Sequence, residues 1–142
     1  MKKERIEFPD TVLWSSKRVI EAEDINIAQH MGNERILVWA DQIRQQFLND
    51  IGWSEESTLT EFGLIVANHT IIYQSEGFLG DPIHIDVAVN ELTEFSFDIL
   101  IRCKKENATR NLVVMRTGMV CFNYLKREIT PIPSQFLDKL EA

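Results

Sequence analysis

The chain has 142 residues, of which 44% are hydrophobic and 26% charged, with a formal net charge of -7 and a pI of about 5.0. This length and balance predict one folded domain over residues 1–142, which buries roughly 70% of its unfolded surface without disulfides or metals. The acidic charge argues against a broad nucleic-acid or anionic-membrane surface, because such surfaces need clustered lysine and arginine.

Cysteine usage and the N-terminal sequence point to a cytoplasmic protein. Cys103 and Cys121 lie in apolar runs and form no C-x-x-C pair, so we expect two reduced, buried thiols. The charged N-terminus has no apolar stretch behind it, and no segment reaches the length of a membrane span. We expect neither a signal peptide nor a metal or other cofactor.

The first part of the chain predicts a strand, an irregular segment and one long helix. Residues 16–22 alternate as a strand does, and residues 23–32 are polar and irregular. From 33 to 51, apolar residues recur every three or four positions, as in an amphipathic helix. Asn33 suits the N-cap, and Gly52 stands where a glycine often ends a helix.

The rest of the chain predicts strands. Apolar or alternating runs cover residues 63–74, 83–90, 96–102 and 112–125, and residues 80–82, 105–107 and 126–128 carry turn chemistry. Pro131 and Pro133 should end the sheet and open a short helix reaching Leu140. One strand, one long helix and four strands in meander order make an α+β fold, in which the sheet curls around the apolar stripe of the helix. A cystatin-like or cone-shaped α+β fold also fits this periodicity.

Several short motifs, in this order, carry a resemblance to a known family. Asp24-Ile25-Asn26 precedes His30-Met31-Gly32-Asn33, Tyr73 comes ahead of a Gly80-Asp81 turn, and Pro131-Ile132-Pro133 closes the series. Together they resemble the acyl-CoA thioesterase branch of the hotdog superfamily, which includes 4-hydroxybenzoyl-CoA thioesterase, over nearly the whole chain. The resemblance implies a hotdog fold, hydrolysis of an acyl-CoA thioester, and active sites built between the subunits of a homodimer or homotetramer.

The sequence departs from the family pattern at one position. In the best-studied members of the family that the chain resembles, the second acid of the Asp-x-Asp segment is the catalytic carboxylate. Aligned without gaps from His30, that position is Asn26 here. An amide is no general base at neutral pH and is a poor nucleophile. The first acid of the segment is retained as Asp24. The resemblance therefore supports the fold more firmly than the activity.

Thioester hydrolysis needs a polarised carbonyl and an activated water, and the predicted helix start offers groups for both. Backbone amides near Gly32, Asn33 and Glu34 suit a developing oxyanion, and Gly32 lets a substrate approach the backbone. His30 either positions or deprotonates water, or it only hydrogen-bonds the loop.

Four further candidates each have two interpretations. Asp24 is either the base or an acceptor that organises the loop, and Asn26 either holds water or the thioester oxygen, or makes an Asx turn. Asn33 is either a plain N-cap or a catalytic group. Glu34, the remaining carboxylate at the helix start, either faces the cleft across a dimer or is a solvated first-turn acid.

Residues farther from the helix start complete the expected site. The three tryptophans either line an acyl tunnel or pack in the core or an interface: Trp14, Trp39 and Trp53. A CoA moiety would cross a surface groove and touch basic residues among Arg102, Lys104, Lys105, Lys126 and Arg127. His69 and His84 lie on predicted strands without a carboxylate or cysteine at ligand spacing, so no metal site is expected there.

Two function classes follow. The first is an acyl-CoA thioesterase whose base is Asp24, His30 or a water network around Asn26. The second is a non-catalytic protein of the same fold that binds acyl-CoA or an acyl carrier. A hotdog dehydratase lacks its His-plus-acid signature here, and a lipid-binding cone fold is a further alternative. In each case the long apolar strands would leave an unpaired edge in a monomer, so we expect a homodimer or a larger assembly.

Overall fold

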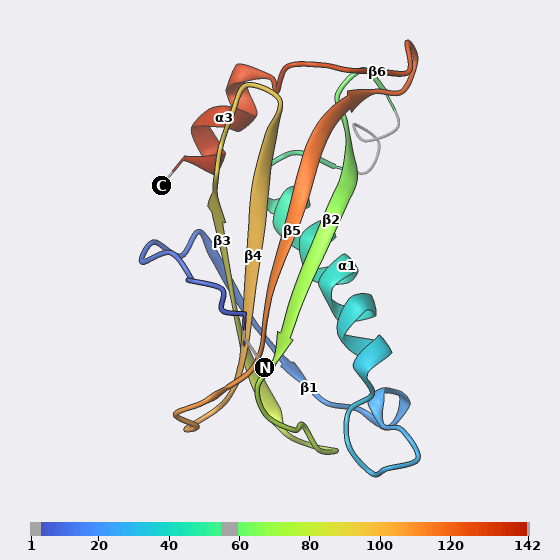
Figure 1. Cartoon of the computed structure of the whole chain (residues 1–142), viewed down its shortest axis with the longest axis vertical. Helices are drawn as coiled ribbons and strands as arrows, with labels where there is room; N and C mark the ends of the chain where they lie inside the picture. Colours follow the sequence, from blue (N-terminus) through green and yellow to red (C-terminus); the bar gives the residue numbers. More distant parts are fainter. Residues whose placement is uncertain (1–3, 55–59, 142) are drawn as a thin grey trace.

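The computed structural model describes residues 4–54 and 60–141. Along the chain the elements are β1 (Trp14–Val19), a short 3-10 helix η1 (Ala22–Asp24), α1 (Asn33–Asp50), β2 (Gly63–Tyr73), β3 (Pro82–Asn90), β4 (Ser96–Lys105), β5 (Asn111–Asn123), β6 (Glu128–Ile129) and α3 (Ser134–Leu140). The sheet is antiparallel and α1 lies along one of its faces (Figure 1). The predicted α+β class is confirmed.

The order of strands in the sheet differs from the predicted meander. The order is β1-β3-β4-β5-β2, so β2 pairs with β5 and not with β3, which follows it in sequence. The prediction of four strands in meander order was therefore wrong. The connection between β2 and β3 has to cross the end of the sheet. It passes the start of α1, where the carbonyl of Gly77 accepts the amide of Met31 at 2.8 Å.

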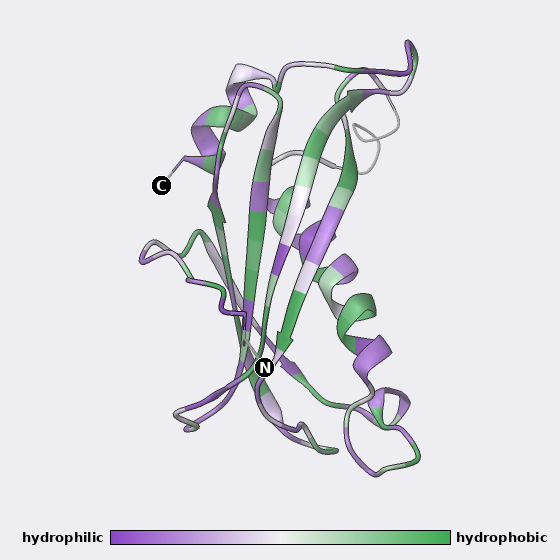
Figure 2. Cartoon of the chain, viewed as in Figure 1, coloured by the Kyte–Doolittle hydropathy of each residue, from purple (hydrophilic) through white to green (hydrophobic). Residues whose placement is uncertain are grey.

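A row of apolar side chains across the sheet forms the surface on which α1 packs. Val87 pairs with Ile101, Ile101 with Met115, and Met115 with Ile71, so these side chains share one face. The buried stripe of α1 covers this face with Ile36, Ala40, Ile43 and Phe47. Hydrophobic residues accordingly run along the central strands in Figure 2, and polar ones gather in the loops. Burying this face is the main stabilising contribution to the fold.

The ends of α1 show one error in the sequence prediction and one success. The N-cap is Gly32, with extended φ and ψ of -69° and 145°, and Asn33 is already helical. The prediction of Asn33 as N-cap was therefore wrong, because the carbonyl of Gly32 accepts the Arg35 amide at 3.1 Å. At the other end Gly52 has φ +89°, which favours glycine as predicted.

The C-terminal segment closes the core. Residues 126–128 were predicted as a turn, but Glu128 belongs to β6, in which Ile129 pairs with Phe122 of β5. The predicted C-terminal helix is confirmed as α3, which places Phe136 on Trp53 with ring centroids 4.4 Å apart and an interplanar angle of 7°. Within the described residues, no helix has both the length and the apolar character needed to cross a membrane.

Candidate active site

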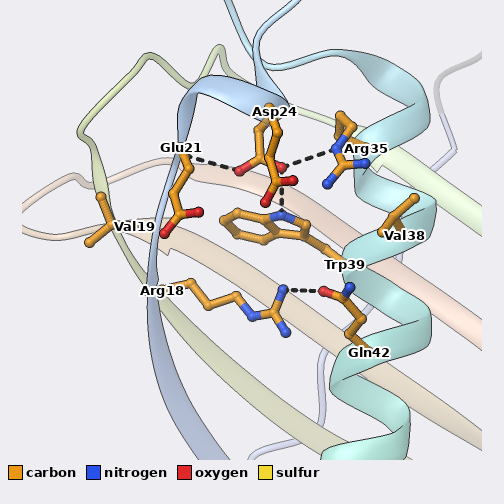
Figure 3. Close-up of a pocket in the computed structure, with 9 residues that line it drawn as sticks. Arg18, Val19, Glu21, Asp24, Arg35, Val38, Trp39 and Gln42 are labelled. Carbon is orange, nitrogen blue, oxygen red and sulfur yellow. Dashed lines mark hydrogen bonds and ion pairs between the residues drawn. The ribbon is translucent and has the colours of Figure 1, made fainter.

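Asp24 organises the segment that leads into α1. Its side chain is buried, and its Oδ1 accepts hydrogen bonds from Arg35 Nε at 3.0 Å and Trp39 Nε1 at 3.2 Å. Its Oδ2 accepts the backbone amide of Glu21 at 3.0 Å. Figure 3 shows these three contacts converging on the carboxylate. Asp24 therefore fixes the loop to the first turns of the helix, which is the loop-organising alternative.

Asn26 shapes a tight loop. Its side-chain Oδ1 accepts the amide of Ala28 at 3.0 Å, which is an Asx turn, and its own amide donates to the His30 carbonyl at 2.9 Å. The loop is tight enough to hold Gln29 at φ +68° and leaves the Ile27 side chain 97% exposed. The side-chain oxygen of Asn26 is thus already used within the loop.

His30 is half-buried and lies beside the helix start. Its Nδ1 lies 2.9 Å from the carbonyl of Met31. A carbonyl only accepts, so Nδ1 donates this hydrogen bond. His30 also lines a cavity.

The first backbone amides of α1 are free. The structure assigns no acceptor among the described residues to the N–H groups of Asn33 and Glu34. The Glu34 carboxylate folds back over the helix start, since a Cβ built on Gly32 would lie 2.5 Å from its Oε1. A carboxylate is attracted to the positive end of the helix dipole. Two hydrogen-bond donors and one carboxylate therefore meet at this point.

A cavity of about 200 Å³ opens beside these groups. The end of β2 contributes Tyr73, whose hydroxyl donates to the Asn33 carbonyl at 3.0 Å. Glu34 contributes to raising the pKa of Tyr73, after the larger effect of burial, so the two groups are neighbours at the rim. The connection after β2 contributes Ser75, Glu76 and Gly77.

Sequence reasoning did not place Ser75 and Glu76 in the site. The only available signal was a short polar run directly after a strand, and its position depends on the crossing connection. Gly77 has a structural reason to be glycine, because an added Cβ would lie 2.5 Å from the Ile20 side chain. Its small size lets the connection lie close to the core beside the helix start.

A second cavity, of about 440 Å³, lies between β1 and α1 on the other side of the helix (Figure 3). Arg18 lies over the Trp39 ring at 5.3 Å and donates to Gln42 at 2.7 Å. Glu21 and Glu23 balance the two arginines that line the cavity. It therefore offers mixed charges but none of the free helix amides, so it fits a thioester carbonyl less well than the first cavity.

The basic residues expected to contact CoA separate into two groups. Lys104 and Lys105 end β4 at the end of the sheet where β2 reaches the helix start, whereas Lys126 and Arg127 follow β5 at the opposite end. Lys105 lies 3.5 Å from Asp81. The predicted set therefore does not form one surface, because antiparallel strands place alternate turns at opposite ends.

The tryptophans serve mainly in packing. Trp39 and Trp53 are buried, and the indole of Trp53 donates to the Phe62 carbonyl at 2.7 Å. Trp14 donates to Asp50 at 2.6 Å and meets Phe47 edge-on at 6.5 Å. None of the three lines the cavity beside the helix start, so the tunnel interpretation receives no support there.

Sequence comparison identifies the family. The profile of the Thioesterase-like superfamily matches residues 20–140. The chain belongs to this superfamily. The match covers the loop, α1, β2 to β6 and α3, and with them every residue of the candidate site. No curated protein sequence matches the chain.

Solved structures of thioesterases share the fold. A 1,4-dihydroxy-2-naphthoyl-CoA thioesterase from Synechocystis superposes with a TM-score of 0.80 at 15% identity, covering 89% of this chain and 93% of that one. A gentisyl-coenzyme A thioesterase gives 0.78 at 17%, covering 90% and 100%. A Staphylococcus aureus protein solved in complex with CoA gives 0.82 at 17%, covering 95% and 85%. The predicted hotdog fold is confirmed.

Proposed function

We propose that this protein is an acyl-CoA thioesterase that hydrolyses its substrate at the start of α1. The observation that carries the proposal is the start of α1, where the Asn33 and Glu34 amides have no acceptor among the described residues and the Glu34 carboxylate folds back over Gly32. This helix start adjoins a cavity lined by His30 and Asn33. Membership of the thioesterase-like superfamily supports the reaction class. The Staphylococcus aureus protein of similar fold was solved in complex with CoA, which supports a CoA thioester as the substrate.

The amides of Asn33 and Glu34 are the proposed oxyanion site. A thioester carbonyl placed against them gains two hydrogen bonds as its oxygen becomes negative in the tetrahedral intermediate. Removing one donor of this kind typically costs about 3–4 kcal/mol in the transition state. The positive end of the α1 dipole adds to the same stabilisation.

Glu34 is the proposed general base. It removes a proton from water as the water oxygen bonds to the carbonyl carbon, and the intermediate then collapses by breaking the carbon–sulfur bond. The departing CoA thiolate takes up the proton that Glu34 holds. His30 orients the water through Nε2. Among the other candidates, Asp24 is already engaged by Arg35 and Trp39, and the oxygen of Asn26 by Ala28, which leaves Glu34 free for this role.

A second copy of the chain is proposed to complete the site. Among the described strands, β2 pairs only with β5, so its other edge is open over 11 residues. A long open edge of this kind favours pairing with another strand. Antiparallel pairing of two β2 strands gives a homodimer, and dimers can assemble further into tetramers.

The substrate is proposed to be a CoA thioester hydrolysed without a metal or other cofactor. Within the described residues, no three His, Cys, Asp or Glu side chains are placed to hold a metal ion. Cys103 and Cys121 are buried free thiols, which supports the cytoplasmic location proposed from the sequence.

A thiol-release assay over short, medium, long and aromatic acyl-CoAs tests the proposal. We expect hydrolysis of at least one class, and a decrease in kcat of about 10²–10⁴-fold in Glu34→Gln. Glu23→Gln removes the same charge from an exposed position outside the cavity and should leave the rate unchanged. The rate of Asn26→Ala tests whether the shape of the loop matters for hydrolysis, and the rate of His30→Ala tests whether the orientation of the water matters. Full activity in Glu34→Gln would remove Glu34 from the mechanism.

The alternative function is a non-catalytic acyl-CoA or acyl-carrier binding protein. The observation that favours it is Asn26, an amide at the position where the family carries its catalytic carboxylate. Calorimetric titration with the same acyl-CoAs separates the two proposals. Binding without thiol release from any of them would replace the enzyme with the binding protein.

A further inference from the structure

Arg44 is a buried cation with incomplete pairing. It lies in the middle of α1, and its side chain is only 8% exposed. Its Nη1 has no hydrogen-bond partner within the described part of the chain, and its Nη2 meets Asp41 at 3.3 Å. Asp41 is itself 61% exposed and also accepts from Gln45. Burying an incompletely paired charge is costly, so Arg44 needs an explanation.

The surroundings of Arg44 supply little negative charge. His69 of β2 lies nearby, with its Nδ1 2.9 Å from the hydroxyl of Thr117. Burial lowers the pKa of His69 and the Arg44 cation lowers it further, against a smaller opposing effect of the Asp41 carboxylate. Burial also lowers the pKa of Arg44 itself, as expected for a cation with too little compensation. An anion at this place would be stabilised.

Arg44 lines a cavity of about 160 Å³ whose other walls are largely apolar. The apolar walls come from Leu48, Trp53, Leu64, Val66 and Met119, and Asp41 and Gln45 of α1 also line the cavity. The cavity lies between α1 and the first half of β2. The cavity beside the helix start lies between α1 and the end of β2. Both are small for a complete acyl group together with its thioester.

The proposed dimer brings the two kinds of cavity together. β2 runs from Gly63 to Tyr73, with a β-bulge between Val66 and Asn68. Antiparallel pairing of two β2 strands sets the end of one strand beside the start of the other. In such a dimer the helix-start cavity of one subunit would adjoin the Arg44 cavity of the other. The two cavities would then form one cleft, with the oxyanion amides at one end and a guanidinium at the other.

We infer that Arg44 of the partner subunit binds an anionic group at the far end of the acyl chain. The substrate class is then a CoA thioester whose acyl group carries a terminal carboxylate, as in the monothioester of a short dicarboxylic acid. The inference rests on the proposed thioesterase function and names its specificity. The carboxylate would replace Asp41 on the guanidinium and engage Nη1 and Nη2 together, which is the geometry arginine favours with carboxylates. Nη1 is buried in the single chain, so the guanidinium turns toward the cavity when the anion binds.

The test compares adipoyl-CoA with hexanoyl-CoA, which have six-carbon acyl chains and differ in the terminal carboxylate. We expect wild-type kcat/KM to be at least about tenfold higher for adipoyl-CoA, the ratio that a difference of about 1.4 kcal/mol gives. Arg44→Met should lower kcat/KM for adipoyl-CoA at least about tenfold and so remove this preference. Arg116→Met is the matched control, since Arg116 lies on the opposite face of the sheet, where it contacts Thr70.

Because Arg44 is buried, a lost preference in Arg44→Met could also come from a folding defect. A second variant at an exposed position separates the two causes. Asp41→Asn removes the carboxylate that competes for Arg44, so it should increase the preference for adipoyl-CoA. Equal rates for the two substrates in wild type, or a preference unchanged in both variants, would overturn the inference and leave the thioesterase intact. If neither substrate is hydrolysed, the panel of acyl-CoAs decides the thioesterase proposal separately, and calorimetric binding of these two thioesters decides the role of Arg44.

Discussion

Replacing Asp24 by alanine should strongly destabilise the protein. The change deletes an acceptor of three hydrogen bonds, from Arg35, Trp39 and the Glu21 amide, and the bond from Arg35 is also an ion pair. Trp39 is 3% exposed, so its indole N–H would lose its partner inside the protein. The loop before α1 would also lose its attachment to the helix.

The size of the loss in unfolding free energy depends on whether each of the donors finds another acceptor once the carboxylate is removed. A buried donor left without an acceptor costs about 1–3 kcal/mol, and this applies to Trp39. A hydrogen bond to a charged group contributes about 1.5–3 kcal/mol, but the Arg35 side chain is 25% exposed and regains water, so its share is at the lower end. Together we expect a loss of about 3 kcal/mol, a large fraction of the 5–15 kcal/mol typical of a domain.

Urea unfolding measures this loss. Asp24→Asn should fall between the wild type and Asp24→Ala, because its oxygen still accepts from Arg35 and Trp39 while its NH₂ group opposes the Glu21 amide. Glu23→Ala, one residue away and exposed, should stay within about 0.5 kcal/mol of wild type. A loss below about 1 kcal/mol in Asp24→Ala, with an unchanged m-value, would refute the assignment of Asp24 as the organiser of the loop.

Three further predictions follow from the structure. Gly32→Ala should displace the Glu34 carboxylate, because the new Cβ would lie 2.5 Å from its Oε1. We expect kcat to fall at least about tenfold while the protein stays folded. An unchanged kcat would show that the position of Glu34 does not matter for the reaction. Tyr73→Phe removes one hydrogen bond to the helix start and should cost about 1 kcal/mol in urea unfolding, whereas a loss above about 3 kcal/mol would contradict this role. Burial raises the pKa of Cys103 to about 12 and that of Cys121 to about 11, so these thiols stay protonated in the folded state while their unfolded counterparts ionise above about pH 9. Their contribution to stability is complete below that pH and lost between about pH 9 and 12, and Ellman's reagent should react with either cysteine only after unfolding.

The sequence predicted the elements well because their signals are local. The spacing of Ile36, Ala40, Ile43 and Phe47 identifies α1, and Gly52 marks its end. The order of strands was missed because the pairing of β2 with β5 depends on contacts far apart in the chain, which alternation within a strand does not encode.

The candidate site was predicted only in part, for a related reason. The segment from Asp24 to Glu34 was identified, but the roles within it depend on partners brought by other elements. Arg35 and Trp39 of α1 engage Asp24, and the Asn33 carbonyl receives Tyr73 from the end of β2. Arg44 shows the same limit, since periodicity assigns a charged helix residue to solvent and the structure buries it against β2.

A crystal structure with a non-hydrolysable CoA thioether ketone tests the central claim most directly. We expect the ketone oxygen to lie within hydrogen-bond distance of the Asn33 and Glu34 amides, in the cavity beside Tyr73, with the acyl group pointing toward Arg44 of a partner subunit. A ligand bound in the cavity between β1 and α1, or a monomer whose helix start contacts no ligand, would contradict it.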